Sequence, residues 1–173
     1  MNPFAETICP PEYLYQMKYS RLTKEQFEEL HQEFINFLAT QSITAEEWSD
    51  IKVNKPEVAE QELDVFSDLI WEGVLSKVDY LEHISPQHMH LFHCTPKEMR
   101  LIALKIKASD IDITTEEGYD WFRNNLLSDD VEFFTAKKEY SEHKNQDKFK
   151  LIQEGANITK GELYKYFENL VSK

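Results

Sequence analysis

Two proline-containing breaks in the middle of the chain constrain the fold more than any other feature. Ser85-Pro86-Gln87-His88 and Thr95-Pro96-Lys97-Glu98 each carry proline at the second position, which is typical of a type I turn. They separate three runs of about seven residues, at 78–84, 88–94 and 99–106. This pattern predicts a small antiparallel β-meander over about residues 78–106.

A helical alternative exists at both ends of this stretch. Thr95-Pro96-Lys97-Glu98 is also a good helix start, and the apolar residues after it recur at helical spacing. Leu81 and Ile84 fit a continuation of the preceding helix. We prefer the meander, and a helix at either end stays the alternative.

The meander brings three histidines together if its first turn is the two-residue turn Pro86-Gln87. His83 then faces His90 across the strands, and His88 shares a face with His90 because side chains alternate along a strand. Three histidines with an open fourth position can hold zinc, and also iron or copper. His83, His88 and His90 are therefore a candidate metal site, with Asp79 and Cys94 further along the same face.

Other features favour an ordinary structural role for these histidines. The same register places Lys105 opposite His88, and a cation is a poor neighbour for a metal ion. Phe92 and Leu101 share the face, which favours a face half-covered by a helix as the alternative. His93 lies on the opposite face, where we expect a semi-buried, hydrogen-bonded side chain.

Helical patterns flank the meander on both sides, so the predicted fold class is α+β. Residues 23–41 and 44–54 each begin with a capping box, and the third and longest helix follows Pro56. After the meander we expect a helix opened by Thr114-Thr115-Glu116-Glu117, a strand at 131–135, a helix ending at Gly155 and a last helix capped by Thr159. The result is a helical N-terminal layer, the meander and C-terminal helices.

The charge distribution favours a basic protein partner over phosphate or anionic lipid. The 173 residues carry a formal net charge of −13. The negative charge is concentrated in residues 25–82, where 15 acids face only Lys52, Lys55 and Lys77. Such a field repels phosphate backbones and attracts basic surfaces.

The first sixteen residues differ from the rest of the chain. They carry three prolines and no periodicity, and they lack the basic and apolar regions of a secretory signal. We expect an irregular extension at 1–16, Met17 as an alternative start, and one α+β domain at 17–173. Two cysteines form no disulfide framework, and no apolar run approaches the length of a membrane span, so we expect a cytoplasmic protein.

The C-terminal stretch from Gly155 to Phe167 resembles the turn and recognition helix of TetR-type repressors. The shared pattern is glycine followed by Thr159-Lys160-Gly161, Leu163-Tyr164 and Phe167. This resemblance implies DNA binding through the last helix. The match has two extra residues after Gly155 and lies at the C-terminus, and the alternative is an amphipathic helix packing Leu163, Tyr164 and Phe167 into the core.

The motifs of common enzyme classes are missing from the sequence. Four glycines supply neither GxGxxG nor GxxxxGK[ST]. Cys94 and His93 are adjacent in a predicted strand and point to opposite faces, so they do not suit a thiolate and its base.

Several short segments along the chain resemble one family. They are Leu22–Gln26, Ile43–Trp48, Asp68–Leu75, Tyr80–Pro86, Met89–His93 and Ile158–Tyr164. Together they are similar to an uncharacterised bacterial domain-of-unknown-function family of short cytosolic proteins, over about residues 17–173. The resemblance implies one compact domain and carries no known activity.

The function predicted from these features is a non-enzymatic interaction or regulatory protein that presents its acidic helices to a basic partner. A metal-dependent enzyme using His83, His88 and His90 with zinc or iron is the alternative. Nucleic-acid binding through the last helix is the third hypothesis. We expect no other cofactor and no membrane association.

Overall fold

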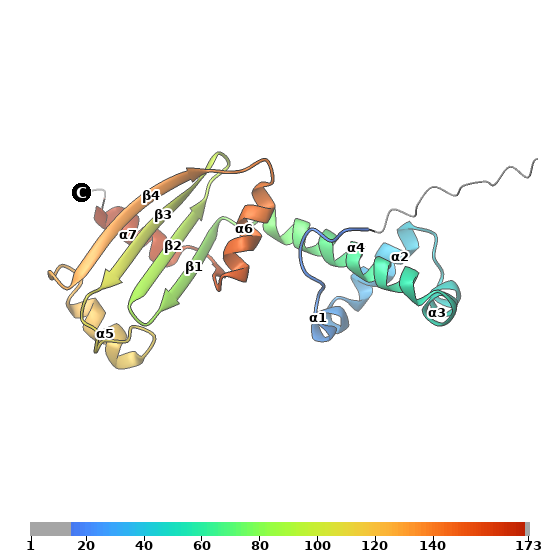
Figure 1. The fold of residues 1–173 in the computed structure, drawn as a ribbon, viewed down its shortest axis with the longest axis horizontal. Coiled ribbons are helices and arrows are strands. Elements are labelled where there is room, and N and C mark those ends of the chain that lie inside the picture. The colour runs from blue at the N-terminus through green and yellow to red at the C-terminus, as the bar shows by residue number, and fades with distance from the viewer. Residues whose placement is uncertain (1–14, 172–173) are drawn as a thin grey trace, which may run out of the picture. The chain divides into compact units, whose positions relative to one another are not determined.

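The computed structural model describes residues 15–171 and has an α+β fold, as predicted. The chain divides into two compact units at Trp71. We call described residues 15–71 the helical unit and described residues 72–171 the sheet unit (Figure 1). The expectation of a single domain at 17–173 stays a prediction.

Four helices build the helical unit, and the last of them, α4, continues into the sheet unit. Both predicted capping boxes form, at Thr23 before α1 and at Thr44 before α3. α4 begins at Pro56 and is the longest helix, as predicted. The bounds are α1 Lys24–Glu29, α2 His31–Thr40, α3 Ala45–Asn54 and α4 Pro56–Leu75.

The single helix predicted over residues 23–41 is wrong, because the chain turns at Leu30. Leu30 has φ −99° and ψ 21°, which ends α1 and begins α2. The turn allows aromatic side chains from both helices to reach one buried ring on α4. Phe27 and Phe34 lie 5.8 and 5.0 Å from Phe66 between ring centroids.

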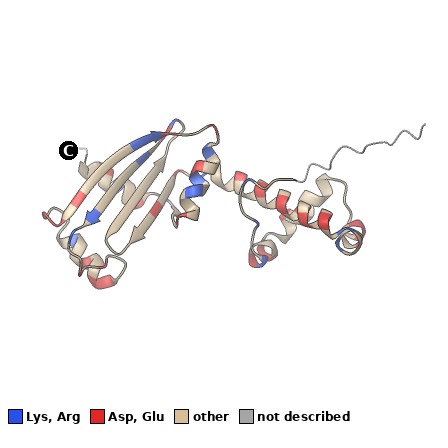
Figure 2. Cartoon of the chain, viewed as in Figure 1, with Lys and Arg blue, Asp and Glu red and all other residues tan. Residues whose placement is uncertain are grey.

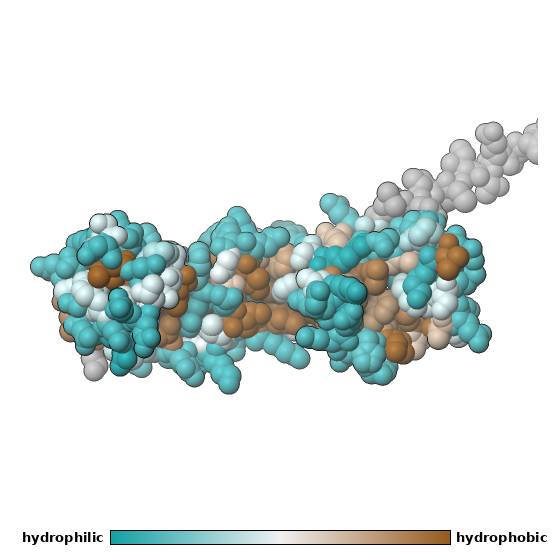
Figure 3. All heavy atoms as spheres, turned by 90° about the horizontal axis from the view of Figure 1, so that it is seen from below, coloured by the Kyte–Doolittle hydropathy of each residue, from teal (hydrophilic) through white to brown (hydrophobic). Residues whose placement is uncertain are grey.

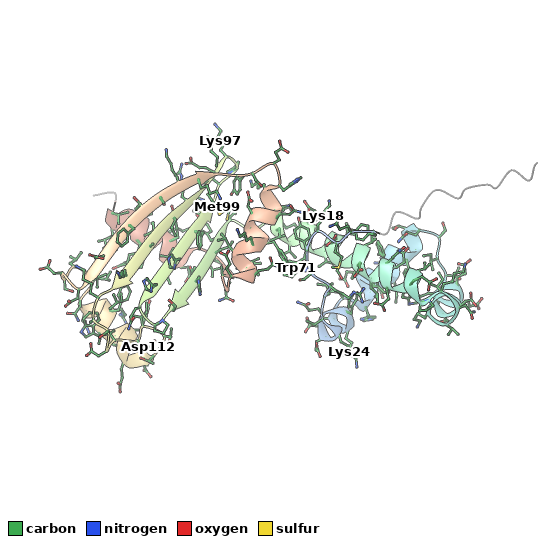
Figure 4. All side chains as sticks on the ribbon, in the orientation of Figure 1. Lys18, Lys24, Trp71, Lys97, Met99 and Asp112 are labelled. Carbon is green, nitrogen blue, oxygen red and sulfur yellow. The ribbon has the colours of Figure 1, made fainter. Side chains whose placement is uncertain are left out.

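A buried carboxylate on α4 holds the segment that precedes α1. Asp68 accepts hydrogen bonds from the Tyr15 hydroxyl at 2.6 Å and from the backbone N–H groups of Lys18 and Tyr19 at 2.7 and 3.0 Å. Trp71, labelled with Lys18 in Figure 4, donates its indole N–H to the Ser20 carbonyl. Residues 1–14, most of the predicted extension, lie outside the described residues, and the alternative start at Met17 stays a prediction.

The sheet unit contains one five-stranded antiparallel sheet in the order β4-β3-β2-β1-β5. The predicted meander is confirmed as β1 Tyr80–Ser85, β2 His88–Cys94 and β3 Glu98–Ile106. β4, Val131–Glu139, extends well beyond the predicted strand at 131–135. β5, Asn157–Thr159, was not predicted; it pairs with β1 just before the last helix.

Three helices cover the two faces of this sheet (Figure 1). α5 Glu116–Asn124 and α7 Glu162–Val171 pack on one face, where Met89, Leu91 and Leu104 are at most 1% exposed. α6 Lys144–Gln153 packs on one end of the other face, beside Leu81 and Phe92. We call this second face the open face, because α6 covers only part of it.

A buried lysine joins α6 to the end of α4. Lys148 is 2% exposed, and its Nζ donates to the carbonyls of Leu75 and Val78 at 2.7 and 2.8 Å. Leu75 is the last residue of α4 and Val78 lies just beyond it, so the lysine supplies a donor where the helix ends. Burial lowers the pKa of Lys148 from its ordinary value.

Within residues 15–171, no helix is long and apolar enough to cross a membrane.

Candidate functional site

The first β-hairpin places the three predicted histidines together on the open face. Ser85 pairs with His88 and His83 with His90, which confirms the two-residue turn at Pro86-Gln87. His88 also pairs with Lys105 on β3, as predicted. The hairpin register, and the shared face that follows from it, were therefore accessible from the sequence.

The three imidazole rings stack side by side on this face. The His90 ring lies 6.1 Å from both His83 and His88 between centroids, with interplanar angles of 26° and 13°. Phe92 continues the stack 6.5 Å beyond His90. Rings stacked in this way lie side by side, whereas ligands of one metal direct their nitrogens at a common point.

Within residues 15–171 there is no group of three or more His, Cys, Asp or Glu side chains placed to hold a metal ion. A metal site at His83, His88 and His90 would need new side-chain rotamers. It stays a prediction, which metal analysis of protein purified without a polyhistidine tag tests.

The surroundings of His90 favour its neutral imidazole. Burial lowers the pKa of His90, and the neighbouring His83 and His88 lower it further. Gly155, at the end of α6 with φ +103°, approaches the edge of the His83 ring. A Cβ at this glycine would lie 3.4 Å from Nε2 of His83, so the chain after α6 limits the room around that nitrogen.

Cys94 lies at the end of the open face that α6 covers. Its side chain is 3% exposed, and burial raises the pKa of the thiol. A protonated, buried thiol is a poor nucleophile. Cys94 is therefore a core residue in this structure, packed with Leu81 and Met99.

His93 points to the opposite face of the sheet, as predicted. Its ring stacks on Tyr80 at 4.6 Å and meets Tyr164 edge-on at 5.2 Å. The buried Nδ1 has no hydrogen-bond partner among the described residues. The predicted semi-burial of His93 is confirmed, and a hydrogen bond at its other ring nitrogen, Nε2, stays a prediction.

A groove that no sequence pattern predicted lies where α6 meets the open face. Its volume is about 400 Å³ and its floor is apolar, formed by Phe92, Met99, Leu101, Ala136 and Leu151. Figure 4 labels Met99 on β3. The groove depends on how far α6 reaches across the sheet, which no local pattern encodes.

The C-terminal segment that resembles a recognition helix is part of the core. Tyr164 and Phe167 on α7 are 3% and 1% exposed, and Leu163 packs beside them. β5 lies between α6 and α7, so the two helices are not joined by a simple turn. The packing alternative for α7 is confirmed, and DNA binding stays a prediction that a low-salt DNA titration tests.

A second candidate surface lies on the helical unit. A groove of about 730 Å³ opens between the helices, and its apolar lining is Phe27, Phe34, Trp48, Pro56, Ala59 and Leu63. Polar side chains at the same groove are Lys24, Glu28, His31, Lys52 and Glu60. Figure 3 shows hydrophobic surface of this unit set among hydrophilic surface.

Exposed acids outnumber basic residues on the helices of this unit, although the groove itself is lined by Lys24 and Lys52 as well as by Glu28 and Glu60. The helical unit holds 12 acidic and 5 basic residues in the range 15–71. Glu25, Glu29, Glu33 and Glu57 are all exposed, and the acids are spread over its helices in Figure 2. The acidic field predicted for residues 25–82 therefore faces solvent over most of the helical unit.

Comparison with known families assigns the chain to one of them. A profile described as a family of unknown function, DUF6495, matches residues 17–172, and the chain belongs to that family. No curated protein and no solved structure matches the chain. The family resemblance found in the sequence is thus confirmed, and it supplies no activity.

Proposed function

We propose that this member of a family of unknown function is a non-enzymatic, cytoplasmic interaction or regulatory protein that binds a basic, amphipathic helix of a partner. The binding site is the aromatic-lined groove of the helical unit. The observation that carries the proposal is the combination, in one small unit, of an open aromatic groove and an excess of exposed acids.

The aromatic side chains in and around the groove support binding of the apolar face of the partner helix. Phe34 contacts Trp48 at 5.3 Å and Phe37 at 6.0 Å between ring centroids, yet all three rings remain partly exposed. A groove lined by aromatic rings accepts the apolar face of an amphipathic helix, whose anchor residues recur every three or four positions. Aromatic anchors of this kind carry much of the binding free energy at interfaces.

The exposed acids of the helical unit support binding of the basic face of the partner helix. A basic partner is attracted by the net charge of the unit, which raises the association rate and disfavours acidic competitors. Only two acids of the helical unit, Glu60 and Asp64, pair with an arginine among the described residues, and that arginine is Arg21. On α1, Glu28 also lies 3.8 Å from Lys24, and on α3 Glu47 accepts from the Thr44 N–H in the capping box. The other exposed acids of these helices, among them Glu25, Glu29 and Glu33, can pair with lysine or arginine side chains of a partner.

A defined peptide tests the proposal without knowledge of the natural partner. The probe is a synthetic helix built from leucine and lysine, and its control carries glutamate at every lysine position. We expect the lysine peptide to bind the full chain, with affinity falling as salt rises because exposed charges are screened. Equal binding of both peptides, or binding indifferent to salt, would contradict the proposal.

Matched charge variants locate the binding unit. Glu28→Lys with Glu57→Lys changes two exposed acids of the helical unit, of which Glu28 lines the groove and Glu57 follows the lining residue Pro56. Glu142→Lys with Glu154→Lys makes the same charge change in the sheet unit. We expect the first pair to weaken lysine-peptide binding by about tenfold, roughly 1.4 kcal/mol, and the second pair to leave it nearly unchanged. Similar losses in both variants would show that peptide binding depends on the net charge of the whole chain and not on the helical unit, which would contradict the proposal.

A further inference from the structure

β4 forms a long free edge of the sheet. It pairs with β3 along all nine of its residues, and no strand within the described part of the sheet unit pairs with its other side. The opposite edge, β5, has only three residues. A long edge strand presents a row of unpaired N–H and C=O groups on which another strand can pair. In Figure 1, β4 lies along the outer border of the sheet.

The register shows which backbone groups point outward. The Lys107 N–H donates to the Asp130 carbonyl at 2.8 Å, one position beyond the Ile106–Val131 pair. Asp130 therefore faces β3, and hydrogen-bonding direction alternates along an antiparallel strand. The residues whose N–H and C=O groups point away from β3 are Val131, Phe133, Thr135, Lys137 and Glu139.

The middle of these outward residues is also the middle of the strand. Thr135 lies four positions from both ends of β4. If β4 of a second copy runs antiparallel with Thr135 opposite Thr135, the outward N–H and C=O groups of Phe133, Thr135 and Lys137 all find partners in the other copy. At the ends of the strand, the Val131 N–H already donates to the Ser128 carbonyl at 3.2 Å. The pairing is isologous, since each contact occurs twice about one two-fold axis.

The side chains of the open face match in this register. On the open face, Glu132 lies opposite Lys138 of the second copy, and the reverse pair repeats the contact. Within residues 15–171, Glu132 contacts Lys107 at 3.0 Å, whereas Lys138 has no carboxylate within salt-bridge distance. Phe134, which is 53% exposed, lies opposite Ala136 of the second copy. Opposite charges and apolar pairs directly across two strands stabilise a sheet.

We propose that two copies of this chain pair through their β4 strands, antiparallel about Thr135, to form one continuous sheet. The dimer covers the exposed Phe134 ring and supplies Lys138 with a carboxylate. It leaves the α5 and α7 layer of each copy on its own sheet.

Charge reversal and its compensation test the register. Sedimentation equilibrium of the full chain should show a concentration-dependent dimer. Glu132→Lys alone and Lys138→Glu alone each place like charges opposite one another twice, and we expect each to weaken dimerisation about tenfold. The combined variant restores opposite charges and should return the dissociation constant to about that of the native chain. Lys97→Glu, a single charge reversal in the turn before β3, is the control and should change little.

A backbone variant separates strand pairing from charge. Thr135→Pro removes an N–H that points away from β3, so the contacts inside the sheet remain. We expect a monomer whose thermal unfolding matches that of the native monomer. A native chain that is monomeric at all concentrations overturns the proposal, as does a combined charge variant no better than the single ones. A Thr135→Pro chain that is folded and still dimeric also overturns it.

Discussion

Aromatic residues are buried more deeply in the sheet unit than in the helical unit. In the sheet unit, Phe122 and Phe167 are each 1% exposed and lie within a core shared by the sheet, α5 and α7. In the helical unit only Phe66 among the aromatic residues reaches that level of burial, and the rings around it stay partly exposed. The sheet unit therefore stabilises itself, while the helical unit retains apolar surface that a partner can cover.

The charges of the two units reinforce this difference. The helical unit carries a net charge of −7 over residues 15–71, and its short helices α1 and α3 contain no buried residue. Self-repulsion and shallow burial both lower the stability of a compact unit. We infer that the sheet unit supplies most of the stability and the helical unit most of the recognition.

The largest expected effect is the loss of unfolding free energy when an aromatic ring is removed from the sheet unit rather than from the helical unit. Phe167→Ala removes a fully buried ring, and we expect the sheet unit to lose about 3–5 kcal/mol of unfolding free energy. Phe37→Ala removes a partly exposed ring and should cost the helical unit roughly half as much. Chemical denaturation followed by circular dichroism measures both, and equal losses would contradict the difference between the cores.

A buried lysine gives the next largest effect. Lys148→Met removes the buried ammonium that donates to the carbonyls of Leu75 and Val78, although Leu75 keeps the Val78 N–H at 3.3 Å as a second donor. We expect a loss of about 1–3 kcal/mol. Lys150→Met, an exposed lysine on the same helix, is the matched control and should change stability by less than about 0.5 kcal/mol. Indistinguishable melting temperatures for the two variants would show that the bonds of Lys148 contribute little.

A smaller effect tests how far capping sustains the helical unit. The Thr44 side chain accepts a hydrogen bond from the Glu47 N–H at the start of α3. Thr44→Ala should lower stability by about 1 kcal/mol, and a helix without buried residues should lose helicity locally. Ser49→Ala, within the same helix, is the control. Loss of signal from the sheet unit alone would contradict this local role.

The smallest effect concerns pH and the histidine stack. The pKa of His90 is lower in the folded chain than its ordinary value of 6.5, chiefly because of burial. As pH falls below 6.5, the unfolded chain takes up a proton first, so the sheet unit should lose stability. His90→Gln should reduce this loss in melting temperatures taken at pH 7.5 and 5.5, and His31→Gln, on exposed α2, should not. A native chain whose stability rises as the pH falls from 7.5 to 5.5 would contradict this prediction.

The sequence predicted those parts of the fold that short-range patterns determine. The proline turns set the register that places His83 opposite His90, and threonine caps set the start of α3. The break at Leu30 was missed because no proline or glycine marks it in the sequence. The rings on either side of it, Phe27 and Phe34, both contact Phe66 on a distant helix. β5 was missed because three residues carry no periodicity, and pairing with β1 alone makes them a strand.

The candidate sites divide in the same way. Strand alternation predicted that the three histidines share one face. The orientation of their rings could not be predicted, because it depends on packing against Phe92 and Gly155. The acidic field was visible in the composition, but the aromatic groove requires α1, α2, α3 and α4 to be assembled. Long-range packing thus decides what the local patterns leave undetermined.

Hydrogen exchange of the full chain, alone and with the leucine–lysine peptide, tests the division between the units most directly. We predict that amides of β2 and β3 exchange only through global unfolding, while those of α1 and α3 exchange through local opening. The peptide should slow exchange in α1, α2 and α3 and leave β2 and β3 unchanged. Equal protection in both units of the free chain, or slowing confined to the sheet unit, would contradict the account.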